Sequence, residues 1–146
     1  MNDNFFSPTS NKNYSINCNG RLVDLSQPRV MGILNLTPDS FSDGGKFNNI
    51  TSALKHTEDL LNNGASIIDI GAQSTKPDSQ KITAKEEIER LGTTISTIKR
   101  EFPEALISLD TFYGEVVNFG YNEGIDIVND IFQSMHQYLI NDKYVC

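Results

Sequence analysis

Polar side chains follow each of four apolar segments of the sequence, at the point where the apolar segment ends. Asn35 follows the first, Ser74 and Thr75 follow the second, Asp110 closes the third and Asn129 closes the fourth. The carboxyl ends of parallel strands meet at one edge of a sheet, where such folds build their sites. Asn, Asp and Thr are also common helix N-caps, so each residue alone has a purely structural reading. Four on one edge favour a binding or catalytic site.

The segment after the first apolar run, residues 35–45, has a composition that a plain connection does not need. It contains two carboxylates (Asp39 and Asp43), three hydroxyls, the aromatic Phe41 and two glycines. A strand-to-helix connection usually takes 2–6 residues. A longer loop of this kind is typical of an active-site lid. Its oxygen ligands suit a hard cation such as Mg²⁺ better than zinc.

Several other reactive residue types lack a pattern that would give them a chemical role. His56 and His136 stand alone, and Cys18 and Cys146 have no metal-ligand spacing. We interpret the two cysteines as free thiols rather than a disulfide. Asp69, inside the second apolar run, is interpreted first as a buried polar residue of the fold, and a role in the site is the secondary interpretation.

The elements that must position these residues alternate between strands and helices. Residues 14–25 predict a hairpin around the Asn19–Gly20 turn. Apolar runs then predict four buried parallel strands, and helical spacing predicts the helices between them. The strands are expected at residues 30–34, 66–70, 106–109 and 125–128. The first helix is expected from about residue 51 to a cap at Gly64, and the second over about 83–102, starting at the capping box Thr83–Glu86. Two more are expected over 113–123 and beyond residue 131.

Strict alternation of strands and helices predicts an α/β fold with a parallel sheet, either open or part of a (β/α)8 barrel. No G-x-G-x-x-G or G-x-x-x-x-G-K-[ST] motif follows the first strand, so the nucleotide-binding open sheets lose their main support. We expect residues 1–13 to be a disordered tail and residues 14–146 to form one domain with about four βα units.

Composition excludes several classes of function. The chain has 146 residues and a net charge of −7, with no basic stripe to neutralise the phosphates of a nucleic acid. It has no secretory signal and no apolar run long enough to span a bilayer. These features predict a soluble cytoplasmic protein without nucleic-acid or membrane partners.

Four blocks of the sequence resemble dihydropteroate synthases, the folate-pathway transferases of the pterin-binding TIM-barrel family. MGILNLTPDSFSDGGKF is similar to the family's first signature and IIDIGAQSTKP to its second, while SLDTF and IVND resemble the next two strand ends. The resemblance implies a (β/α)8 barrel, here its N-terminal half behind the hairpin. It implies condensation of 6-hydroxymethyl-7,8-dihydropterin diphosphate with p-aminobenzoate to give 7,8-dihydropteroate and diphosphate.

The resemblance also implies residue roles. Asn35 matches the ligand of a Mg²⁺ ion that accompanies the diphosphate, and Asp110 and Asn129 match groups that hydrogen-bond the pterin, with Asp110 placed to stabilise positive charge during catalysis. The other expected substrate-binding residues lie in the first two loops. They are Asp39 and Asp43 over the metal and diphosphate, Phe41 and Pro77 around p-aminobenzoate, and Ser74, Thr75 and Lys76 in the second loop.

The chain departs from the family pattern in three respects. Lys76 stands where arginine is usual, which removes a bidentate phosphate contact, and Asp78 replaces a common glycine. The second half of the barrel, with a further aspartate, a lysine and an arginine–histidine pair, has no counterpart in residues 133–146.

Three hypotheses therefore stand: a dihydropteroate synthase whose activity as this chain alone is open; a truncated inactive fragment that binds pterin or a partner subunit; and, more weakly, another pterin-binding barrel such as a methyltetrahydrofolate methyltransferase domain. Homodimer formation is left open.

Overall fold

The computed structural model describes residues 14–37, 46–73 and 81–130, without the side chains of 46–48. A two-stranded hairpin, β1 (Ser15–Cys18) and β2 (Arg21–Asp24), precedes a parallel sheet. The sheet has the strand order β3 (Val30–Asn35), β4 (Ala65–Gly71), β5 (Leu106–Asp110) and β6 (Ile127–Asn129). The helices between the strands are α1 (Lys46–Asn62), α2 (Ala84–Leu91), α3 (Thr94–Glu101) and α4 (Gly114–Glu123). The chain is thus a partial (β/α) barrel, as predicted.

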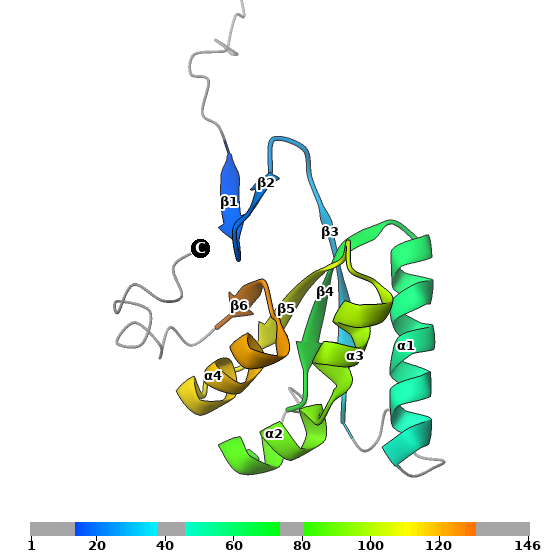
Figure 1. Cartoon of the computed structure of the whole chain (residues 1–146), viewed down its shortest axis with the longest axis vertical. Coiled ribbons are helices and arrows are strands. Elements are labelled where there is room, and N and C mark those ends of the chain that lie inside the picture. Colours follow the sequence, from blue (N-terminus) through cyan, green and yellow to red (C-terminus); the bar gives the residue numbers. More distant parts are fainter. Residues whose placement is uncertain (1–13, 38–45, 74–80, 131–146) are drawn as a thin grey trace, which may run out of the picture.

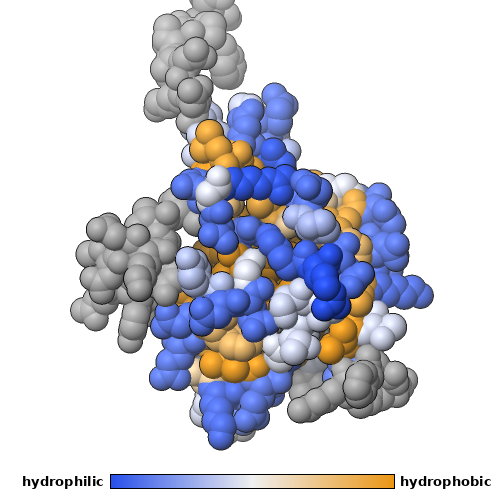
Figure 2. Space-filling model, in the orientation of Figure 1, coloured by the Kyte–Doolittle hydropathy of each residue, from blue (hydrophilic) through white to orange (hydrophobic). Residues whose placement is uncertain are grey.

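The helices pack against one face of the sheet and bury the main core (Figure 1). The strand residues on this face are fully buried: Leu34, Ile68, Ile70, Ile107 and Leu109. They pack against apolar residues of the helices, such as Ile95, Ile98 and Val116. On the outside of the helices, hydrophilic residues cover most of the face drawn in Figure 2, and apolar residues gather in smaller patches.

The hairpin closes the end of the sheet where the parallel strands begin, and the strands end at the opposite edge (Figure 1). Its buried Cys18 and Val23 pack with Ile67 and Leu106 in a second, smaller core. Asn19 and Gly20 form the turn, both with positive φ, as an Asn-Gly hairpin requires. The edge where the strands end is therefore left for loops, and the hairpin end carries contacts that hold the fold together.

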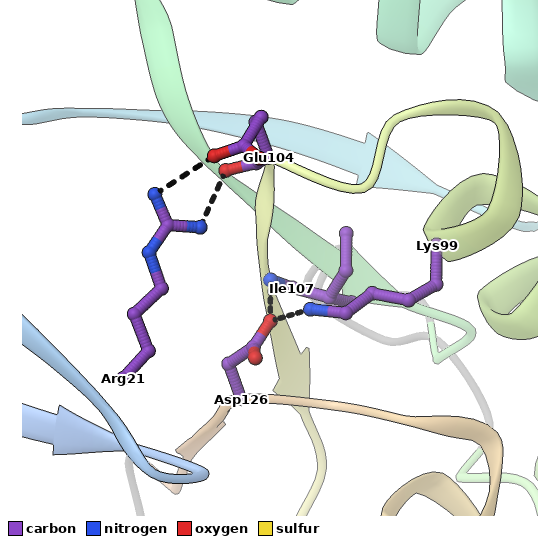
Figure 3. A network of polar contacts seen from close by, with 5 residues as sticks. All are labelled: Arg21, Lys99, Glu104, Ile107 and Asp126. Atoms are coloured by element: carbon purple, nitrogen blue, oxygen red, sulfur yellow. Dashed lines mark hydrogen bonds and ion pairs between the residues drawn. The ribbon is translucent and has the colours of Figure 1, made fainter.

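Polar contacts near the hairpin end join segments that are distant in sequence (Figure 3). The buried Asp126 carboxylate accepts hydrogen bonds from Lys99 Nζ of α3 at 2.5 Å and from the Ile107 backbone N–H of β5 at 2.8 Å. Arg21 of β2 donates to the Glu104 carbonyl at 3.0 Å and pairs with the Glu104 carboxylate at 3.3 Å. The second contact is largely exposed, so Asp126 is expected to contribute more to stability.

The structure corrects three sequence-based boundaries. Helix α1 begins at Lys46, not near residue 51. The single helix predicted over about 83–102 is two helices, because Gly92 has a φ of +49° and separates α2 from α3. Strand β6 begins at Ile127 rather than residue 125, where the register with β5 starts. The Ile125 N–H donates to the Gly120 carbonyl of α4, and the Asp126 N–H donates to the Ile107 carbonyl of β5.

The other predicted boundaries agree closely with the structure. The capping box is present, with the Thr83 side chain accepting from the Glu86 N–H and the Glu86 carboxylate accepting from the Thr83 N–H. Helix α4 ends at Gly124 with a left-handed φ of +100°. The helix predicted beyond residue 131 lies outside the described residues. No helix in the described ranges is both long and apolar enough to cross a membrane.

Candidate functional site

Strand register brings the predicted polar residues into one row at the edge where the strands end. Asn35 of β3 pairs with Gly71 of β4, Gly71 with Asp110 of β5, and Asp110 with Asn129 of β6. Register partners in adjacent strands point to the same face of the sheet. Asn35, Asp110 and Asn129, expected from sequence at one edge, therefore share one face of that edge.

Gly71 keeps the space between Asn35 and Asp110 clear. A Cβ atom at this position would lie 3.6 Å from Asp110 Oδ2 and 3.7 Å from Asn35 Oδ1. These distances are ordinary contacts, so a single methyl group fits, but any longer side chain would stand between the two polar groups. A side chain at the buried Gly71 would therefore contact both an amide oxygen and a carboxylate.

Asp69 lies one layer deeper in the same face and holds Asn129 in place. The Asn129 Nδ2 donates a hydrogen bond of 3.1 Å to Asp69 Oδ2, and Asp69 is only 6% exposed. This bond leaves the Asn129 Oδ1 and its second N–H for other partners. Asp69 was predicted to be mainly a buried polar residue of the barrel. The structure supports that interpretation and also places it in contact with the site.

The pKa of Asp110 is raised, as is typical of functional carboxylates. Burial is the largest cause that raises its pKa, and the negative charges of Asp69 and Asp130 raise it further. A cationic or hydrogen-bond-donating ligand stabilises a carboxylate that lies near like charges, because the ligand offsets their repulsion. Asp110 is not a helix cap, since α4 begins after Tyr113. The structural interpretation of Asp110 as an N-cap is therefore wrong.

The other predicted site residues belong to the two loops outside the described residues. Asp39, Phe41 and Asp43 fall within 38–45, and Ser74, Thr75, Lys76 and Pro77 fall within 74–80. Their roles stay predictions. No group of three or more His, Cys, Asp or Glu side chains in the described ranges is arranged to hold a metal. The donors that border Gly71, from Asn35 and Asp110, are oxygens, and oxygen donors fit Mg²⁺ by chemistry.

Sequence reasoning missed two residues behind the site. Glu87 of α2 is fully buried, and Thr111, directly after Asp110, is 4% exposed. A glutamate in the first turn of a capped helix is usually exposed to solvent. The sequence contained one indication that Glu87 is buried. Glu87 lies at helical spacing from Leu91 and Thr94, which are both buried.

Comparison with known proteins agrees with this geometry. The family model described as "Pterin binding enzyme" matches residues 31–142, which include β4, β5, β6 and all of β3 except Val30. The chain belongs to the pterin-binding enzyme family. The sequence-based assignment to this family is therefore confirmed, and the residues of the strand-end row all lie within the matched range.

Named members of the pterin-binding family are close in sequence. The chain is 46% identical over 112 residues to dihydropteroate synthase of Escherichia coli K12, covering 77% of this chain and 39% of that protein. It is 49% identical over 114 residues to the mitochondrial folate synthesis bifunctional protein of Arabidopsis thaliana, covering 76% of this chain and 21% of that protein. The chain thus spans at most about two fifths of the length of these two relatives.

Solved structures of the family share the fold. Dihydropteroate synthase of Xanthomonas albilineans with 4-aminobenzoic acid matches with a TM-score of 0.75 and 36% identity, covering 84% of this chain and 45% of that one. Dihydropteroate synthase of Anaplasma phagocytophilum with bound 6-hydroxymethylpterin-monophosphate matches with a TM-score of 0.67 and 37% identity, covering 77% and 43%. These likenesses confirm the predicted partial barrel.

Proposed function

We propose that the strand-end row binds a pterin diphosphate and that the chain serves the dihydropteroate synthase reaction. The observation that carries this proposal is the register Asn35–Gly71–Asp110–Asn129, which places a carboxylate and two amides in one row, with no side chain at Gly71 between Asn35 and Asp110. A pterin presents N–H donors and ring acceptors along one edge, and this row offers matching partners. Relatives with the same fold are named for this reaction and one holds a pterin monophosphate.

In the proposed reaction, the C–O bond between the pterin methylene and diphosphate breaks, and diphosphate leaves with the electron pair. The amine of p-aminobenzoate then forms the C–N bond and loses a proton. Asp110 accepts hydrogen bonds from the pterin and stabilises the positive charge that develops on it. Asn129, fixed by Asp69, orients the ring. No covalent nucleophile on the protein is required.

Magnesium belongs to this proposal as well. Asn35 would be a ligand of Mg²⁺, with Asp39 and Asp43 of the first loop nearby and Ser74, Thr75 and Lys76 on the diphosphate. The ion would neutralise charge on the departing diphosphate. Phe41 and Pro77 would pack around p-aminobenzoate.

The cell compartment and the oligomeric state remain proposals too. We propose the cytoplasm on the basis of the sequence composition, although one relative is mitochondrial by name. Association into a homodimer is left open.

Turnover by the 146-residue chain, given the pterin diphosphate, p-aminobenzoate and Mg²⁺, tests the proposed activity. Formation of dihydropteroate that is lost in Asp110→Asn would support catalysis by this chain. Pterin binding without product would favour the second candidate, a binding fragment. That candidate draws on Asp110, whose pKa is raised by burial and by the charges of Asp69 and Asp130.

Replacement of Gly71 by valine is expected to keep the fold and to weaken pterin binding by about tenfold, or about 1.4 kcal/mol. Valine suits a strand, and its Cβ has room, but its two methyl groups would enter the space between Asn35 and Asp110. Calorimetric titration with the pterin measures the effect. The matched Gly71→Ala variant should bind more tightly than the valine variant. Equal affinity of Gly71→Val and the unmodified chain would show that the pterin does not occupy the space between Asn35 and Asp110.

A further inference from the structure

Among the described residues, Asp69 combines deep burial with a single hydrogen-bond partner. It lies in β4 between Ile68 and Ile70, whose side chains are fully buried on the opposite face of the sheet. The Asp69 Oδ2 accepts the 3.1 Å hydrogen bond from Asn129, and no described residue donates to its Oδ1, which is also buried. Burial of a carboxylate with so few donors costs stability. This cost indicates a role at Asn129 rather than in packing.

The bond to Asp69 decides which way the Asn129 side-chain amide faces. A carboxylate only accepts hydrogen bonds, so the NH2 group of Asn129 must face it. The Oδ1 of Asn129 is the other branch of the planar amide, and it therefore points away from the deeper layer in which Asp69 lies. An amide turned the other way would bring two acceptor oxygens together and leave both Asp69 oxygens without a donor.

The fixed direction of this amide gives the strand-end row a hydrogen-bonding polarity. Asp110, the register partner of Asn129, also presents an acceptor, its carboxylate. Both side chains are half-buried and so keep surface that a ligand can contact. Two neighbouring acceptors fit a ligand edge with two neighbouring donors. A pterin has such an edge in its 2-amino group and N3–H, whereas its 2-oxo analogue, a lumazine, carries an acceptor in place of the amino group.

We propose that Asp69 is a specificity-determining positioning residue: by fixing the direction of the Asn129 amide, it makes the strand-end row accept a 2-amino group and reject a 2-oxo group. Asp69 acts through Asn129, because its second oxygen is buried. The effect on ligand choice rests on the proposed pterin site. The direction of the amide does not, and the two are measured separately.

Three variants separate the direction of the amide from packing. Asp69→Asn keeps the shape of the side chain but offers a donor as well as an acceptor, so it satisfies Asn129 in either direction. Asp69→Leu keeps a similar volume and holds Asn129 in neither direction. Ser108→Ala is the matched control. Ser108 is the register partner of Asp69 in β5, is fully buried, and has a hydroxyl without a hydrogen-bond partner among the described residues.

The first measurement is solvent exchange of the Asn129 side-chain amide protons in the ligand-free chain. A bonded N–H exchanges slowly, because its bond must open before solvent reaches it. We expect exchange to be about tenfold slower in the unmodified chain and in Ser108→Ala than in Asp69→Leu, as a hydrogen bond to a charged group predicts. Equal exchange in the unmodified chain and in Asp69→Leu would overturn the proposal.

The second measurement compares the affinities for 6-hydroxymethylpterin and 6-hydroxymethyllumazine by calorimetry. Burial raises the pKa of Asp110 most and the Asp69 charge raises it further, so a change at Asp69 alters absolute affinity for more than one reason. The decisive quantity is therefore the ratio of the two affinities. We expect a preference for the pterin of about 100-fold in the unmodified chain and in Ser108→Ala, falling about tenfold in Asp69→Asn. The fall should come mainly from tighter binding of the lumazine.

An unchanged affinity ratio in a folded Asp69→Asn variant would overturn the proposal, and so would a ratio that falls equally in Ser108→Ala. If Asp69→Leu does not fold, the affinity ratio of Asp69→Asn decides. An unmodified chain that binds neither ligand would contradict the proposed function instead, and the amide exchange would still decide whether Asp69 fixes the direction of Asn129.

Discussion

Asp110→Asn is expected to weaken pterin binding by about 100-fold, equivalent to about 2.7 kcal/mol. The substitution keeps the size of the side chain and removes the negative charge that lies beside Gly71. Hydrogen bonds to a charged group contribute more than those between neutral groups, and the amide also brings an N–H group toward donors of the ligand. Calorimetric titration of the two chains with the pterin measures the difference.

The same substitution is expected to stabilise the fold at neutral pH. Burial and the charges of Asp69 and Asp130 raise the pKa of Asp110 above 3.8, its ordinary value. A carboxyl whose pKa is higher in the folded state destabilises the fold once it is ionised, and this effect vanishes as the pH falls below the unfolded-state pKa. Asp110→Asn should therefore raise the urea midpoint at pH 7.5, and the gain should shrink steadily toward pH 4.

Opposite changes in affinity and stability distinguish a site residue from a packing residue. When a residue that only supports the fold is replaced, the protein loses both ligand affinity and stability. If Asp110→Asn bound the pterin normally, the proposed role of Asp110 would be wrong. If it bound poorly because it was unfolded, the urea midpoint would reveal this directly.

Lys99→Met is expected to lower the free energy of unfolding by about 3 kcal/mol, the typical result of removing one partner of a buried ion pair. Asp126 has a side chain only 7% exposed and accepts bonds from both Lys99 and the Ile107 backbone (Figure 3). Without Lys99, the Asp126 carboxylate still accepts from the Ile107 N–H, but it loses the bond to the Lys99 charge. Urea unfolding measures the loss, and methionine preserves most of the packing of the lysine stem.

The adjacent Arg100 provides the control. Its ion pair with Glu101 is exposed at both ends, 70% and 50%, and exposed pairs contribute at most about 1 kcal/mol. Arg100→Met should therefore change the free energy of unfolding by less than about 0.5 kcal/mol. Equal effects of Lys99→Met and Arg100→Met would show that the network around Asp126 does not hold β5 and β6 together.

Much of the fold could be predicted because local signals and tertiary packing agree. Apolar runs marked β3, β4 and β5 within one or two residues, and Thr83, Glu86 and Gly124 marked helix ends by their capping geometry. The break at Gly92 was missed because apolar spacing continues across it from Ile88 to Ile95. One positive φ changes the chain direction without altering that period.

The position of Asn35, Asp110 and Asn129 at one sheet edge was predictable, but their contacts were not. The strand ends placed Asn35, Asp110 and Asn129 at one edge, since parallel strands end together. The bond from Asn129 to Asp69 depends on strand register, which the sequence does not specify residue by residue. The burial of Glu87 depends on which side of α2 faces the strand ends. A charged side chain is ordinarily expected to be exposed to solvent.

Nuclear magnetic resonance of the asparagine side-chain amides tests the central claim most directly. The claim is that a pterin binds over Gly71, between Asn35, Asp110 and Asn129. Titration with 6-hydroxymethylpterin monophosphate should produce saturable shifts of the Asn35 and Asn129 side-chain amides, while Asn17 in the hairpin stays unchanged. In Asp110→Asn the same shifts should require about 100-fold more ligand to saturate. Saturable binding that leaves Asn35 and Asn129 unperturbed, or an unchanged half-saturation concentration in Asp110→Asn, would contradict the proposed site.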